Sequence, residues 1–228
     1  MRYLLIVALS CVFSALPLGA WADPISVGAQ AGTRGLGLEL SKPLSQNVDL
    51  RLDYSTLQFN RQINSNNQLY DVTANLILNT RFNLASAGAL LDLHHGSSPL
   101  SWVVGLIANY NSVYAKTVPV GNSLVYNGVT YDAASAGNVQ TYIFWSPLAP
   151  YVGIGLNRRW HEHQHSAIVG DVGVFYQRAA QVALVPHGVI AVDPAAAKYL
   201  LRLQGQLRDE LAPYQLYPVL SVGVRFRL

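Results

Sequence analysis

Hydrophobic and polar residues alternate along several segments of this chain. The last segment, residues 216–228, is LYPVLSVGVRFRL, in which every even position is apolar and most odd positions are small, polar or charged. Successive side chains of a β-strand point to opposite faces, so one face of this segment is hydrocarbon and the other carries Arg225 and Arg227. The same alternation recurs at residues 48–54, 70–78, 102–110 and 168–176. The pattern predicts an all-β fold.

The connections between these segments alternate in length. Short ones cover residues 42–47, 94–99 and 157–164, and long ones cover 61–68, 116–139 and 186–213. Outer-membrane barrels have short periplasmic turns and longer outer loops. Counting back from the last segment gives seven strands. An eighth lies within residues 25–40, where the apolar phase changes at Gly32-Thr33-Arg34-Gly35 through either a bulge or a tight reversal. We expect a closed antiparallel transmembrane β-barrel of eight strands.

Composition supports a membrane location. The chain is 51% hydrophobic and only 12% charged, whereas soluble chains average about twice that charge. Only helices and closed barrels satisfy the backbone in lipid, and the chain after its N-terminal segment has no window suited to a membrane helix. The net charge of +3 is small and not clustered, so nothing suggests a nucleic-acid partner.

The N-terminal segment has the features of a secretory signal peptide. Arg2 supplies a positive charge, residues 4–18 are mostly apolar, and Ala20-Trp21-Ala22 is a small-x-small cleavage sequence. We expect residues 1–22 to be removed, which leaves residues 23–228 as one outer-membrane barrel domain. The only cysteine, Cys11, lies in the removed part, so the mature chain has no disulfide and no thiolate site.

Several stretches carry a resemblance to known proteins. The outward positions Leu220, Val222, Val224, Phe226 and Leu228 are similar to the C-terminal assembly signal of bacterial outer-membrane proteins, although that signal usually ends in Phe. With GLGLEL (35–40), ALLDLHH (89–95), APYVGIGL (149–156) and YPVLSVGVRF (217–226), the chain resembles small bacterial outer-membrane β-barrel proteins that are described as porin-like.

The resemblance implies a location in the outer membrane. It also implies insertion by the barrel-assembly machinery and contact with outer-membrane lipids and lipopolysaccharide. It carries no catalytic residues.

Residues 194–212 break the strand pattern and predict one amphipathic helix in the last long loop. Asp193 is suited to cap its N-terminus, Pro194 to begin it and Pro213 to end it. One face is an apolar stripe of Leu200, Leu203, Leu207 and Leu211. The stripe could pack on the barrel mouth, lie on the outer leaflet or contact a partner helix.

Charged residues on the strands are expected to point into the barrel. They are Glu39, Asp49, Arg51, Asp53, Asp71, Asp171, Arg225 and Arg227. The last strand of a closed barrel neighbours the first, so Glu39 could pair with Arg225 or Arg227. These charges could form an ion-pair network that fills the narrow interior, or they could line a narrow polar passage for small solutes.

Three histidines at alternate positions, His161, His163 and His165, are a weak candidate metal site. In an extended segment they would share one face at about 6 to 7 Å spacing, which suits metals that favour imidazole. A solvated turn is the better explanation of these histidines, and we expect no metal or other cofactor.

The sequence predicts a non-enzymatic barrel with a structural or interaction role, or a narrow porin-like passage. The alternative is a lipid-modifying enzyme of the deacylase or acyltransferase type, which needs a histidine beside a serine or carboxylate. The one histidine on a predicted outer loop, His187, has no recognisable partner motif. A soluble periplasmic β-sandwich is the third class.

Overall fold

The computed structural model describes residues 25–65, 72–96, 98–126, 129–132, 137–159, 166–188 and 191–228. Its strands form one antiparallel sheet, and the pairing order β4-β3-β2-β1-β12-β10-β9-β5, with β5 pairing back to β4, closes eight of them into a ring. The ring strands are β1 (Ser26–Gly32), β2 (Gly35–Ser45), β3 (Val48–Ser65), β4 (Val72–His94), β5 (Leu100–Asn109), β9 (Leu148–Arg159), β10 (Ser166–Tyr176) and β12 (Leu216–Arg227).

A tight reversal between β1 and β2 supplies the eighth strand. Thr33 and Arg34 form the turn, and Gly35 follows with φ of +104°, a conformation that favours glycine. The register pairs Ala31 with Leu36 across the turn, so odd positions of β1 and even positions of β2 share a face. The change of apolar phase is therefore a reversal and not a bulge. On its other edge β1 pairs with β12, which closes the ring.

Apolar side chains cover the outside of the ring. Leu38 and Val222 are 65% and 62% exposed, and they belong to a larger exposed set. This set includes Leu36, Leu40, Tyr54, Trp102, Leu106, Val152, Ile154, Val172, Leu220, Val224, Phe226 and Leu228. Among the described residues, no helix is both long and apolar enough to cross a membrane.

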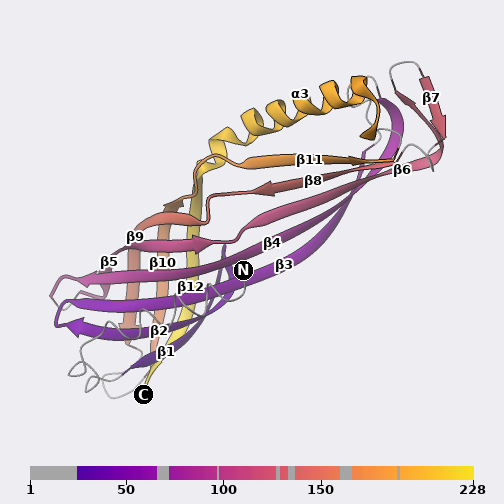
Figure 1. Ribbon diagram of the computed structural model, residues 1–228. Helices are drawn as coiled ribbons and strands as arrows, with labels where there is room; N and C mark the ends of the chain where they lie inside the picture. The colour runs from indigo at the N-terminus through magenta and orange to yellow at the C-terminus, as the bar shows by residue number, and fades with distance from the viewer. Residues whose placement is uncertain are drawn as a thin grey trace.

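Beyond the ring, the sheet continues as a projecting extension. Residues 86–94 of β4 pair with β5, whereas residues 72–83 turn to β6 (Ser112–Tyr126) instead. β8 (Asn138–Phe144) and β11 (Gln181–His187) then add to β6 in order, and the short β7 (Val129–Asp132) also pairs with β6. Figure 1 shows these strands leading away from the ring. The prediction that residues 116–139 form only a connection is therefore wrong, because most of them lie in the strands of the extension.

The two faces of β3 exchange polarity where the ring ends. Inside the ring, Asp53 points inward and is buried, while Tyr54 points outward and is exposed. Further along, the inward row changes to apolar residues such as Phe59, and the outward row changes to polar residues such as Gln58.

Strand β4 makes the same change beside that of β3, at Ser86, which pairs with Ser55 of β3. From Ser86 into the extension, the inward row of β4 continues with Leu84 and Phe82. The outward row continues with Asn83 and Arg81. On β3 and β4 the extension therefore has its apolar row inward, the reverse of the ring. Strands β8 and β11 were missed because apolar residues lie on both of their faces, as Ile143 and Phe144 of β8 do, which weakens the alternation.

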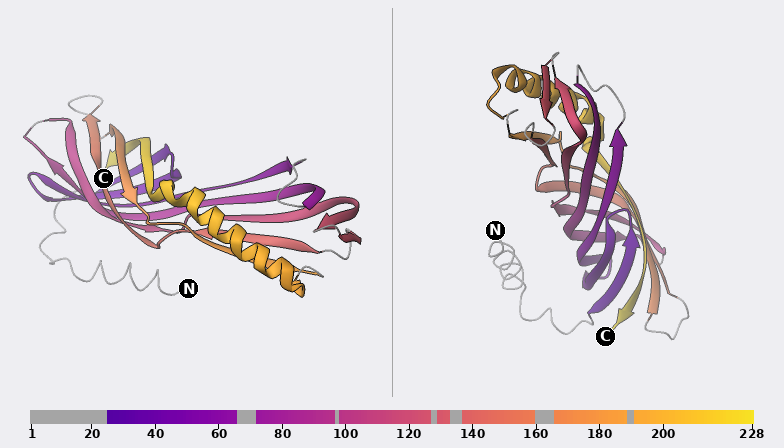
Figure 2. Two further views of the ribbon diagram at one scale, coloured as in Figure 1. Left: turned by 90° about the horizontal axis from the view of Figure 1, so that it is seen from above. Right: turned by 90° about the vertical axis from the view of Figure 1, so that its right-hand side faces the viewer.

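Helix α3 (Pro194–Leu211), followed by the short 3₁₀ segment η3 (Ala212–Gln215), forms as predicted and lies along β11 (Figures 1 and 2). Gln204 Nε2 donates to the Val182 carbonyl oxygen of β11 at 2.6 Å, and Arg208 donates to the same oxygen at 3.4 Å. Leu200 of the predicted stripe is buried. The helix thus covers the outer edge of β11, a surface that the three sequence interpretations did not include because they placed no strand there.

Candidate functional site in the interior of the ring

Arg51 links the two sides of the ring interior. It projects from β3 and forms ion pairs with Asp171 on β10 and, at 3.0 Å, with Asp92 on β4. Its NH1 also lies 3.7 Å from Glu39 Oε2. β3 and β10 are four steps apart in either direction around the ring, so the Arg51–Asp171 pair crosses the interior along a diameter. A solute that passed through the ring would have to displace this side chain.

Two further ion pairs extend this charged cluster. Arg225 Nε donates to Glu39 Oε1 at 2.7 Å, which is one of the two pairings that closure of the ring suggested from the sequence. Arg34, in the turn after β1, points back inside and pairs with Asp53. The buried charged side chains in the described part of the chain are Arg34, Lys42, Arg51, Arg225, Glu39, Asp53, Asp92 and Asp171, which are four bases and four acids. The interior charge is therefore balanced.

Glycines on neighbouring strands make room for these charged groups. A Cβ added at Gly28 would lie 2.7 Å from Glu39 Cγ, and one added at Gly88 would lie 2.9 Å from the Asp53 carboxylate oxygens. An eight-stranded ring is only just wide enough for side chains to fill it. Placing a large charged side chain against glycine is how this sequence fits the cluster.

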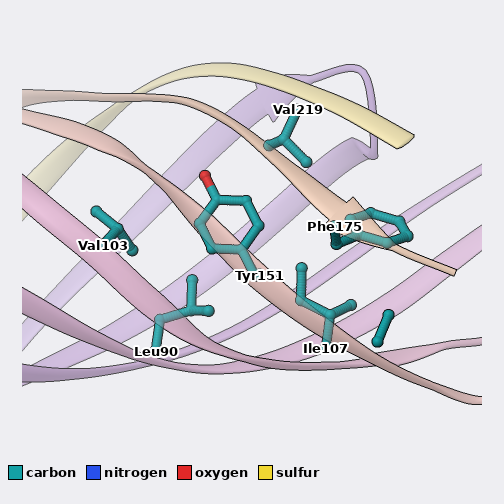
Figure 3. Close-up of a cluster of buried hydrophobic side chains, with 7 residues drawn as sticks. Leu90, Val103, Ile107, Tyr151, Phe175 and Val219 are labelled. Atoms are coloured by element: carbon teal, nitrogen blue, oxygen red, sulfur yellow. The ribbon is translucent and has the colours of Figure 1, made fainter. Parts of the chain in front are cut away.

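A second layer of the interior is apolar. Val103, Ile107 and Phe175 are fully buried and form one cluster with neighbours on other strands (Figure 3). These neighbours are Leu90, Ala149, Tyr151 and Val219. The Phe175 ring stacks on Tyr217 with centroids 4.7 Å apart, and the Tyr217 hydroxyl donates to the Thr33 carbonyl oxygen at 2.6 Å. The described interior is packed with side chains.

The other predicted site residues lie apart from this cluster. Asp49 Oδ2 is 3.1 Å from His94 Nε2, at the end of the ring where β4 turns into β5. Arg227 is exposed near the end of β12, and His187 is exposed at the end of β11. Asp71 and the histidines His161, His163 and His165 lie outside the described residues.

Sequence reasoning missed Asp92, Arg34 and the apolar layer. The alternation could have revealed Asp92, because it lies between the outward-facing Leu91 and Leu93. Arg34 lies in a turn, where alternation carries no information. Inward apolar residues such as Ile107 are an exception to the expected polar interior, so the pattern gave no reason to place them there.

Ion pairs and apolar side chains together occupy the interior of the ring. Within the ranges that the structure describes, no group of three His, Cys, Asp or Glu side chains is placed to hold a metal ion. Arg51 and Arg225 carry permanent positive charges, and each forms ion pairs with acidic side chains of the charged cluster. The arrangement cross-links strands β2, β3, β4, β10 and β12.

We expect Arg51→Met to lower the free energy of unfolding by about 3 to 5 kcal/mol, because it leaves buried carboxylates without their partner. Urea titration of the folded protein in lipid vesicles measures this change. Arg227→Met is the matched control, and it should have little effect because Arg227 is exposed. Equal effects of the two substitutions would contradict the role assigned to Arg51.

No family model and no curated protein matches the sequence. Two solved structures from Acinetobacter baumannii have a similar fold. The crystal structure of CarO2 matches with a TM-score of 0.56 and 19% identity, over 90% of this chain and 99% of that chain. The crystal structure of CarO matches with a TM-score of 0.54 and 21% identity, over 90% of this chain and 98% of that chain. At such identities the likeness shows the fold alone, an antiparallel sheet whose strands close into a ring.

Proposed function

We propose that this protein is a non-enzymatic β-barrel of the bacterial outer membrane. The outside of the ring supports this proposal, since its exposed side chains include Leu38, Trp102 and Val222, which suit hydrocarbon and not water. A closed ring leaves no strand edge unpaired in lipid. The N-terminal sequence, with its predicted cleavage after Ala22, is suited to export.

In this proposal, outer-membrane lipids and lipopolysaccharide contact the outside of the ring, and the barrel-assembly machinery inserts the chain. The outward row of β12 fits that pathway, because Leu220, Val222, Val224 and Phe226 are exposed together. The extension then projects from the membrane, because on β3 and β4 its outward row carries polar residues such as Gln58 and Arg81, where the ring's outward row is apolar.

The packed interior favours a structural or interaction role over an open passage, and the Arg51–Asp171 pair across the ring is the observation that carries this choice. A narrow path for small solutes would require this pair and the cluster around Phe175 to rearrange together. The barrel therefore serves as a membrane anchor that holds the extension in place.

The membrane assignment predicts a position-dependent effect of added charge. Val222→Arg, near the middle of β12, should lower the free energy of unfolding in lipid vesicles by about 2 to 4 kcal/mol, because it places a charge in hydrocarbon. Leu201→Arg on α3 is the control, since Leu201 is 69% exposed in the extension and should tolerate the change.

The wild-type chain should also fractionate with the outer membrane and show heat-modifiable mobility on gels. Recovery in the soluble periplasmic fraction would refute the assignment.

The occluded interior predicts that the protein does not conduct ions. In planar bilayers the purified protein should give no discrete conductance steps, because the charged cluster and the apolar layer occlude the ring. A general porin incorporated in the same bilayers provides the positive control. Regular unitary steps from the wild-type protein would favour the narrow passage and overturn the anchor role.

A further inference from the structure

The extension has an apolar face that continues the inside of the ring beyond its end. Directly opposed residues of antiparallel strands share a face, and the pairs Phe59–Phe82, Phe82–Val113, Val113–Ile143 and Ile143–Val182 form one row across five strands. We call this side the inner face of the extension. Its described side chains are Leu57, Phe59, Arg61, Ile63, Leu78, Thr80, Phe82, Leu84, Val113, Ala115, Thr117, Val139, Thr141, Ile143, Val182, Leu184 and Pro186.

The protein covers this face at one end only. Val182, at the α3 end of the row, is 2% exposed, whereas Phe59, at the other end, is 43% exposed. Leu57 and Ile63 lie on the same row of β3 as Phe59 and are likewise exposed. Contiguous exposed apolar surface outside a membrane marks a binding site more often than chance.

One cation lies in the exposed part of this face. Arg61 is between Phe59 and Ile63 on the inward row of β3, and it is exposed. Of the side chains named above for the inner face, Arg61 alone is charged. A ligand that fits must therefore be mostly hydrocarbon with a single anionic group.

The dimensions of the row suit a long alkyl chain. Adjacent strands are about 4.8 Å apart, so the row from β3 to β11 spans about 19 Å. The stacked rings of Phe59 and Phe82, with centroids 4.8 Å apart, form a flat apolar surface at the start of this path. The path leads toward the increasingly buried end at Val182.

We propose that the inner face of the extension binds a free fatty acid. The carboxylate pairs with Arg61 at the exposed edge of β3, and the alkyl chain crosses Phe82 and Val113 toward α3. This site lies outside the ring and does not depend on whether the ring conducts ions.

The test uses the whole mature chain in nanodiscs of zwitterionic phospholipid, with dansylaminoundecanoic acid as the probe. The probe's fluorescence rises in apolar surroundings, and empty nanodiscs correct for its partition into lipid. We expect saturable binding that Phe59→Asn weakens about tenfold, because burial of one phenyl ring is lost. Gln58→Asn, on the polar face of the same strand, should leave binding unchanged.

The charge is tested with the methyl ester of the same probe. Arg61→Gln should weaken binding of the acid to the level of the ester and leave ester binding unchanged. Arg81→Gln, on the opposite face, is the control and should not alter the preference for the acid. Heat-modifiable mobility verifies that every variant is folded.

Three results would overturn the proposal. The first is a signal no greater than that of empty nanodiscs. The second is equal weakening by Phe59→Asn and Gln58→Asn, or by Arg61→Gln and Arg81→Gln. The third is cross-linking between copies through a cysteine placed at position 59, since it would show that a second chain covers the face.

Discussion

Backbone hydrogen bonding in hydrocarbon is the constraint on which the proposed membrane barrel depends. A strand placed in lipid must pair along both edges, because no water is present to satisfy its N–H and C=O groups. The pairing of β1 with both β2 and β12 meets that requirement by closing the ring. In the proposed membrane location, closure gives each strand one side toward lipid and one toward a narrow interior, and the alternation of residues along the ring strands follows.

Strands β3 and β4 have different surroundings on both faces once they leave the ring. On β3 the outward row changes from Tyr54 to Gln58, and the inward row changes from Asp53 to Phe59. No ring surrounds the inward row at that point, so Phe59 stacks on Phe82 of the neighbouring strand and stays 43% exposed. On β3, one continuous row of side chains thus faces first the ring interior and then the inner face of the extension. In the ring this row is charged and is cross-linked through Arg51, and in the extension it is mostly apolar.

Sequence alone predicts the ring well because the ring strands carry apolar residues on their outward face at every second position. β12 alternates along its whole length, and the reversal at Thr33 and Arg34 was already visible as a change of phase. β6, β8 and β11 were missed because apolar residues occur on both of their faces, as Ile143 and Phe144 of β8 do, so their alternation is weak. The Arg51–Asp171 pair could not be predicted either, since it joins residues 120 positions apart across a diameter that exists only after closure.

The exchange of polarity along β3 is the central claim, and spin labelling tests it directly. The only native cysteine, Cys11, lies in the predicted signal peptide, so single cysteines can be placed on the outward row of the protein in lipid bilayers. The positions are Leu50, Leu52, Tyr54, Thr56, Gln58 and Asn60. Nitroxides should collide mainly with dissolved oxygen up to position 54 and mainly with a water-soluble nickel complex from position 58. Uniform exposure to the nickel complex along the whole row would contradict the account.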